Sequence, residues 1–184
     1  MTAAPTVRLL TPADAHAYTN IRREMLADSP WAFSRTPSDD PGCNPEGLAE
    51  SLSKTSGFAI AAGVDAAGRL VGVAGVSRND SPKLSHRAIL WGVYVSPTYR
   101  GRGLSREVVS AAVDAAFSWP MDGSGEPFSI VNLSVSEFAT TARALYQSLG
   151  FVAWGTQPDA LRTGGRSYAE THMQITRAAW VSRA

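Results

Sequence analysis

The alternation of apolar and polar positions divides the chain into helical and extended segments in a mixed order. Four segments carry apolar side chains at helical spacing: 11–26, 46–54, 104–119 and 140–149. Seven shorter runs are rich in β-branched and aromatic residues, as strands are: 7–10, 57–62, 70–76, 88–95, 129–135, 151–154 and 168–176. This order predicts the α/β class, with a mixed, mostly antiparallel central sheet flanked by helices.

Local signals mark where several of these elements begin and end. Thr11 and Asn44 are expected helix caps, because each precedes a proline suited to the first helical position. The segment 155–167 contains one proline and two further glycines, so we expect a mobile loop there between two terminal strands. Residues 120–127 read as a flexible link.

The most informative stretch joins the strand 88–95 to the helix that starts near residue 104. Pro97 ends the strand, because it cannot donate to a sheet ladder. Gly101 and Gly103 then form a short turn in which the backbone can adopt positive φ and a ligand can approach closely. The first N–H groups of the helix have no partner within it, and Arg100 and Arg102 add positive charge. A diphosphate suits this turn.

Two familiar glycine loops do not fit the sequence here. A Walker loop needs Lys before its final Ser or Thr, and Leu104 and Ser105 follow the last glycine instead. The dinucleotide fingerprint needs a third glycine where Arg106 stands. The remaining pattern, Arg100-Gly101-Arg102-Gly103-Leu104-Ser105, resembles the pyrophosphate loop of the GCN5-related N-acetyltransferase (GNAT) superfamily, Arg/Gln-x-x-Gly-x-Gly/Ala, with Ser in the last place.

A second motif in the expected order strengthens this resemblance. The run from Ala142 to Phe151 resembles the family's Ala-x-x-Leu-Tyr-x-x-x-Gly-Phe. The resemblance implies a GNAT-like (acyl-CoA N-acyltransferase) fold, in which two central parallel strands splay apart and hold the thioester of acetyl-CoA, the co-substrate, between them. It also implies that Val93, Tyr94 and Val95 pair with the pantetheine amides. The turn from Arg100 to Ser105 would then hold the pyrophosphate.

Length, charge and composition limit the number of domains, the classes of partner and the cellular compartment that we expect. The 184 residues suit one domain, 1–184. A formal charge of +1 gives no general case for nucleic acid or membrane partners. A single cysteine, no apolar run of membrane-spanning length and no secretory signal pattern favour a cytoplasmic protein. Three scattered histidines and one cysteine indicate no metal site.

Tyr146 is the leading catalytic candidate, because a protonated phenol can donate to a departing thiolate. The alternative is a core tyrosine with a satisfied hydroxyl. The general base stays open. Many relatives place a Glu where this chain has Ile89, which cannot act as a base. The options are Glu137, which would act through a water molecule, and also Glu24 and His86.

Aromatic residues suggest where the acceptor binds. In the family, the segment that contains Trp31 and Phe33 usually overhangs the acceptor pocket; anchoring a loop on the core is the alternative role. Strict alternation places Trp91 on the same strand face as Val93 and Val95, so we expect it to join Trp31 and Phe33 in the pocket.

These observations predict an acetyl-CoA-dependent N-acetyltransferase in which a primary amine attacks the thioester directly in a ternary complex. The acceptor would be a small-molecule or peptide amine, and a homodimer is common in the family. The sequence lacks the family's Asn at Ala139 and its Glu at Ile89. A catalytically weak acyl-CoA-binding or sensing module with the same fold is therefore the alternative.

Overall fold

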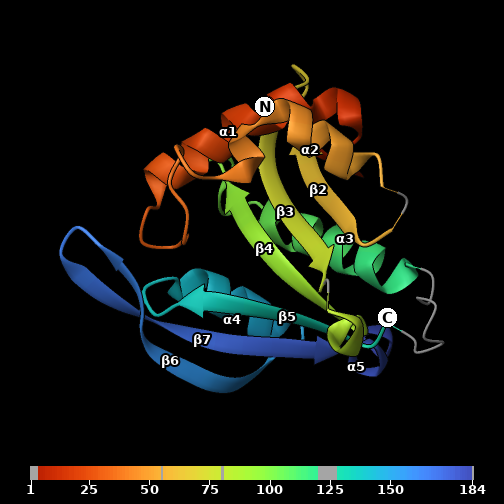
Figure 1. Ribbon diagram of the computed structural model, residues 1–184. Helices are drawn as coiled ribbons and strands as arrows, with labels where there is room; N and C mark the ends of the chain where they lie inside the picture. Colours follow the sequence, from red (N-terminus) through yellow and green to blue (C-terminus); the bar gives the residue numbers. More distant parts are fainter. Residues whose placement is uncertain (1–3, 55, 80, 120–127, 184) are drawn as a thin grey trace.

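Within the part of the chain that the structure describes, seven strands form one sheet with helices on both faces (Figure 1). The computed structural model describes residues 4–54, 56–79, 81–119 and 128–183. The strands are β1 (Thr6–Leu9), β2 (Phe58–Val64), β3 (Leu70–Arg78), β4 (Arg87–Val95), β5 (Ile130–Ser136), β6 (Val152–Thr163) and β7 (Arg166–Thr176). The helices are α1 (Ala15–Asp28), α2 (Pro45–Leu52), α3 (Leu104–Ser118), α4 (Thr140–Ser148) and α5 (Arg177–Val181). The predicted mixed, mostly antiparallel architecture is confirmed.

The sheet order is β1-β2-β3-β4-β5-β7-β6, and among these described strands β4 and β5 form the one parallel pair. The predicted link over residues 120–127 lies outside the described residues. Consecutive antiparallel strands at the start of the chain pair directly, whereas the parallel pair requires the crossover that contains α3.

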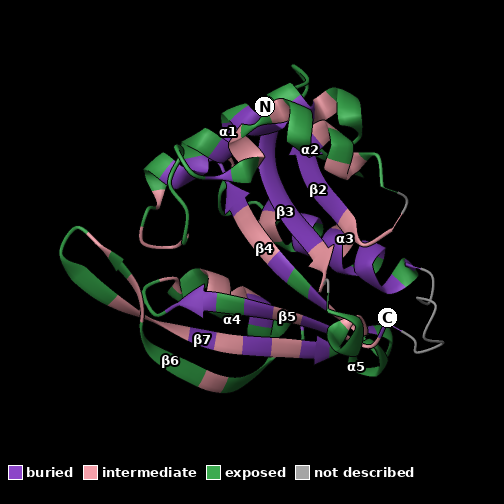
Figure 2. Ribbon diagram, in the orientation of Figure 1, coloured by how far each residue is buried: buried purple, intermediate pink, exposed green. Residues whose placement is uncertain are grey.

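Two apolar cores lie on opposite faces of the sheet. Tyr18, Met25 and Leu48 of α1 and α2 pack with residues of β2, β3 and β4 on one face. Val108 and Tyr146, from α3 and α4, belong to the core on the other face. In Figure 2 the strands under α1 and α2 are almost continuously buried, while β6 and the outer end of β7 are largely exposed.

Capping follows the predicted chemistry. The Thr11 N–H and hydroxyl both hydrogen-bond with the carboxylate of Asp14, in a short 3₁₀ turn that leads into α1. The side chain of Asn44 accepts hydrogen bonds from the N–H groups of Glu46 and Gly47 at the start of α2. Both predicted helix starts are therefore confirmed, with α1 extending two residues further than expected.

The prediction of a mobile loop over 155–167 is wrong. β6 continues to Thr163 and pairs with β7 almost to the turn at Gly164 and Gly165, so this segment is a long antiparallel hairpin. The two glycines supply the positive φ values of a tight two-residue turn, 56° and 74°. Two register shifts in β6 break the alternation that would have revealed the strand in the sequence.

The predicted orientation of Trp91 is also wrong. Gly92 adopts φ of 60°, and the pairing of β3 with β4 shifts register between Val73 and Gly75. Gly92 and Val93 of β4 stand opposite one residue of β3, which marks a bulge in β4. A bulge inserts one residue and reverses the alternation beyond it. Trp91 therefore packs with the α1–α2 core, while Val93 and Val95 contact the core on the α3 face.

Candidate functional site

The two central strands pair briefly and then separate. β4 and β5 pair at Arg87–Ile130, Ala88–Val131 and Ile89–Asn132, and their recorded register ends there. Figure 1 shows the strands diverging from this point, although β4 continues to Val95 and β5 to Ser136. The splayed geometry expected from the family resemblance is thus present, and it leaves one backbone edge of each strand facing the gap.

Residues 93–95 form the β4 edge of this gap. On its other side β4 still pairs with β3, through Tyr94 with Val73 and Val95 with Gly72. Extended backbone that is held on one edge and unpaired with β5 on the other can form hydrogen bonds with amide groups of an extended ligand. Whether Val93, Tyr94 and Val95 bind pantetheine stays a prediction.

The glycine turn lies just beyond the end of β4. Gly101 and Gly103 have φ of 74° and 85°, and Gly103 is the N-cap of α3. The N–H groups of Arg106 and Glu107 donate to the carbonyl oxygen of Gly103. The N–H groups of Leu104 and Ser105 come before them, in the first turn of the helix, where backbone amides have no partner within the helix. An added Cβ at Gly101 would meet no atom within 4 Å. Conformation, together with access to the turn, accounts for glycine here.

The two arginines of the turn have different surroundings. Arg100 donates from Nε to the carbonyl oxygen of Val95 at 2.8 Å and from Nη2 to Asp28 at 2.6 Å. This hydrogen bond from Arg100 lowers the pKa of the Asp28 carboxyl. Arg102 is exposed, with its guanidinium 5.9 Å from the centre of the Tyr99 ring. Arg100 thus ties the turn to β4 and α1, and Arg102 presents the more accessible charge.

Tyr146 lies on α4 and is 6% exposed. Its ring packs edge-to-face on Phe151 at a centroid distance of 5.9 Å. Burial raises the pKa of the phenol above its usual value, so the hydroxyl keeps its proton at neutral pH. This protonation state is the one that a general acid requires.

The three candidates for the general base have different hydrogen-bond partners and positions in the fold. Glu137 accepts a hydrogen bond from the N–H of Ala169 at 2.8 Å, and Glu24 accepts one from the Tyr94 hydroxyl at 3.1 Å. The backbone oxygen of His86 accepts from Ser129 where β4 and β5 are still joined, so this histidine lies at the closed end of the gap.

The segment between α1 and α2 is fixed by a buried ion pair. Arg22 donates from Nε and Nη2 to Asp40, and the two side chains are 10% and 2% exposed. The same guanidinium lies 5.8 Å from the ring centre of Phe33 and 5.9 Å from that of Trp91. Two of the three predicted acceptor aromatics therefore meet at one arginine, and Trp31 is half-buried in the same segment.

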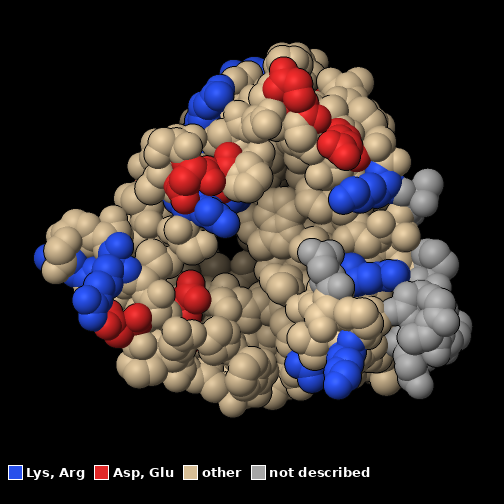
Figure 3. All heavy atoms as spheres, in the orientation of Figure 1, with Lys and Arg blue, Asp and Glu red and all other residues tan. Residues whose placement is uncertain are grey.

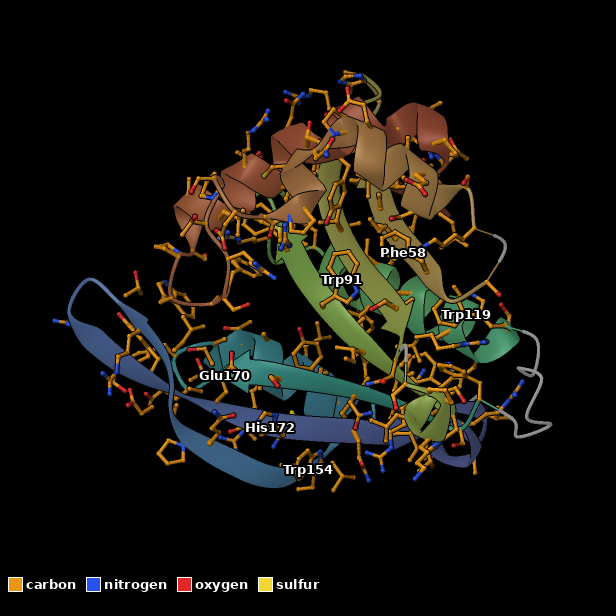
Figure 4. All side chains as sticks on the ribbon, viewed as in Figure 1. Phe58, Trp91, Trp119, Trp154, Glu170 and His172 are labelled. Atoms are coloured by element: carbon orange, nitrogen blue, oxygen red, sulfur yellow. The ribbon has the colours of Figure 1, made fainter. Side chains whose placement is uncertain are left out.

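Sequence reasoning missed a polar group on the opposite side of the gap. Ser136 of β5 pairs in register with Glu170 of β7, and Ser134 pairs with His172. Figure 4 places Glu170 at the opening between β4 and β5, and Figure 3 shows the surface hollowed at the same place. Alternation within 168–176 puts Glu170 and His172 on one face, but the sequence does not reveal that β7 pairs with β5.

Other expectations concern metals and membranes. Among the described residues no group of three or more His, Cys, Asp or Glu side chains is placed to hold a metal ion. None of the helices that the structure describes is long and apolar enough to cross a membrane.

The sheet with its splayed parallel pair and flanking helices has the fold of solved GNAT acetyltransferases, and comparison with known proteins assigns the family. The sequence model of the acetyltransferase (GNAT) family matches residues 18–151. The chain belongs to this family.

Curated relatives are distant. N-alpha-acetyltransferase RimI of Mycobacterium tuberculosis is 27% identical over 162 residues, which are 87% of this chain and 86% of the relative. The uncharacterized protein ML0378 of Mycobacterium leprae is 30% identical over 154 residues, 81% of this chain, and the chain spans about a third (35%) of its length.

Solved structures agree in fold. A phosphinothricin acetyltransferase of Sinorhizobium meliloti in complex with AcCoA superposes with a TM-score of 0.77 at 23% identity, covering 96% of this chain and 89% of that one. The putative acetyltransferase yncA of Salmonella typhimurium with its cofactor acetyl-CoA gives 0.77 at 22% identity, covering 95% and 94%.

Proposed function

We propose that this protein transfers the acetyl group of acetyl-CoA to a primary amine. The observation that carries the proposal is the gap between β4 and β5, which opens beside the positive-φ glycine turn at the start of α3. The turn offers unpaired amides and positive charge to a pyrophosphate, and the β4 edge offers extended backbone to pantetheine. Family membership and the relatives whose names state acetyl-CoA or N-alpha-acetyl transfer support the same reaction.

The chemistry requires few groups. The lone pair of the neutral amine attacks the thioester carbon and forms the C–N bond, while a backbone N–H of residues 93–95 polarises the carbonyl oxygen. The C–S bond then breaks, and Tyr146 protonates the departing thiolate. The proton lost by the amine passes to a base. Holding both reactants in the gap supplies proximity, which is a large share of catalysis when the nucleophile is good.

The experiment mixes the purified protein with acetyl-CoA and a panel of amines, and follows both free thiol and the mass of the acetylated amine. The panel contains amino acids, polyamines and short peptides with free N-termini. We expect equal amounts of thiol and acetylated product with at least one amine class. Tight acetyl-CoA binding without amine-dependent thiol release would instead identify an acyl-CoA-binding or sensing module.

A further inference from the structure

The part of the sheet beyond the gap carries polar side chains on the face that α1 and α2 cover elsewhere. In the parallel register Ala88 pairs with Val131, and both belong to the α3-side core. Ile89 and Asn132, the next pair, therefore face the α1–α2 side. Continuing along β5 in steps of two, Ser136 also faces that side, beyond the point where β4 has turned away.

Ser136 carries a buried hydroxyl that is unsatisfied within the part of the chain that the structure describes. The residue is 4% exposed, and its Oγ has no hydrogen-bond partner among the described residues. An unsatisfied buried polar atom costs about 1–3 kcal/mol, so such atoms are rare in native proteins and call for an explanation. A bound ligand that supplies the missing partner is one.

Glu170 stands directly opposite Ser136 in the antiparallel register. Directly opposed residues have Cβ atoms about 5 Å apart and side chains on one face. Glu170 is half-buried, and within the described part of the chain no hydrogen bond or ion pair reaches its carboxylate. Glu24 and Glu137 differ in this respect, because each accepts a hydrogen bond.

An aromatic pair adjoins this polar pair. Phe138, which follows β5, is 59% exposed and packs edge-to-face on Tyr168 at a centroid distance of 5.4 Å. Tyr168 lies two residues before Glu170 on β7, so the two side chains share a face. A carboxylate and a hydroxyl beside one exposed and one half-buried aromatic ring suit an ammonium group on an apolar carbon chain.

We propose that Glu170 and Ser136 form the subsite for the acceptor's ammonium group, and that Glu170 takes its proton before attack. This inference rests on the proposed function. The N–H bond of the ammonium breaks and its proton passes to a carboxylate oxygen of Glu170, which becomes a neutral acid and later releases the proton to solvent. After attack the nitrogen loses its second proton to water, and Tyr146 regains from water the proton that it gave to the thiolate. Ser136 accepts a second N–H hydrogen bond and orients the nitrogen. The site therefore selects amines that are cationic in solution.

Comparing two small amines distinguishes a role of Glu170 with cationic acceptors from a general loss of activity in the variant. Glycinamide is largely an ammonium ion at neutral pH, whereas hydroxylamine is uncharged and needs no deprotonation. For Glu170→Gln we expect kcat/KM with glycinamide to fall about 100-fold or more, and with hydroxylamine to fall less than about tenfold after subtraction of the uncatalysed reaction. Glu50→Gln removes an exposed carboxylate on α2 and is the matched control.

Ser136→Ala tests the second group. Because none of the described residues pairs with the hydroxyl, the substitution should leave the melting temperature unchanged or raise it, while KM for glycinamide rises several-fold. Equal losses for both amines in Glu170→Gln, or no loss, overturn the subsite while acetyl transfer stands. If the wild type binds acetyl-CoA but releases no thiol with these two amines or with any amine of the panel above, the transferase proposal fails, and the subsite with it.

Discussion

Burial determines the protonation of Tyr146, the residue to which the general-acid role is assigned. The phenol is enclosed by apolar neighbours, and desolvation disfavours the phenolate. The phenol therefore keeps its proton at neutral pH. The family motif predicted this residue, and its burial in the α3-side core is compatible both with proton donation and with a packing role.

Tyr146→Phe distinguishes these roles, since it keeps the ring against Phe151 and removes only the hydroxyl. We expect kcat to fall about 100-fold, the lower end of the usual contribution of general acid catalysis, because thiolate is a tolerable leaving group. Acetyl-CoA affinity should change less than about tenfold. Single-turnover kinetics provide the measurement. Turnover at the parent rate would make the hydroxyl a structural group.

The ion pair between Arg22 and Asp40 is a buried polar anchor of the segment between α1 and α2. Asp40→Ala leaves a buried guanidinium without its partner, so we expect the free energy of unfolding to fall by about 3–5 kcal/mol. Asp39→Ala is the control, because its pair with Arg35 is half-exposed and should contribute no more than about 1 kcal/mol. Urea unfolding followed by tryptophan fluorescence measures both. Similar losses would show that the buried pair does not anchor the segment.

At the level of elements, the bulge in β4 decides which side chains reach which face. Arg22 fills the space beside Gly92, since a Cβ there would lie 2.9 Å from its Nη1. The bulge also explains why Trp91 and Tyr94 both pack on the α1–α2 side although they are three residues apart. A prediction from strict alternation assumes no inserted residue, so it cannot place a bulge. The local sign of the bulge in the sequence was the glycine within the strand.

Gly92→Ala tests the bulge. A non-glycine residue at this φ costs roughly 1–2 kcal/mol, and the close approach to Arg22 adds to that cost. Gly68→Ala is the matched control, because Gly68 has φ of 78° and no atom within 4 Å of an added Cβ. We therefore expect Gly92→Ala to reduce the free energy of unfolding more than Gly68→Ala does. Equal losses in urea unfolding would mean that the contact with Arg22 is easily relieved.

Elements with local signals could be predicted from the sequence, and elements set by distant partners could not. Prolines and capping side chains located α1 and α2 to within two or three residues. The two strands at the base of the β6–β7 hairpin were predicted, but its extension through 155–167 was not, because β6 is exposed along most of its length and its pairing is interrupted by register shifts. Exposure of both strand faces removes the apolar alternation on which strand prediction depends.

At the scale of the whole molecule, one side of the proposed site has local sequence signals, whereas the other side depends on contacts between distant segments. The cofactor side is built from consecutive residues of one strand, one turn and one helix, so a single stretch of sequence predicted it. The acceptor side combines β5, β7 and the segment between α1 and α2, which the fold alone brings around the gap (Figure 1). For this reason Glu170 and Ser136 could not be identified from the sequence as candidate site residues.

The central claim is that acetyl-CoA binds with its pyrophosphate at the turn before α3. Calorimetric titration of acetyl-CoA into Gly103→Glu tests it most directly, because the substitution adds a negative side chain where the phosphates would lie. Gly68→Glu introduces the same side chain at a similar positive φ in the turn between β2 and β3, and so controls for backbone strain. With both variants folded by circular dichroism, we predict an affinity loss of at least about 100-fold for Gly103→Glu and less than about tenfold for Gly68→Glu. Unchanged affinity in folded Gly103→Glu would contradict the placement of the cofactor, and with it the proposed site.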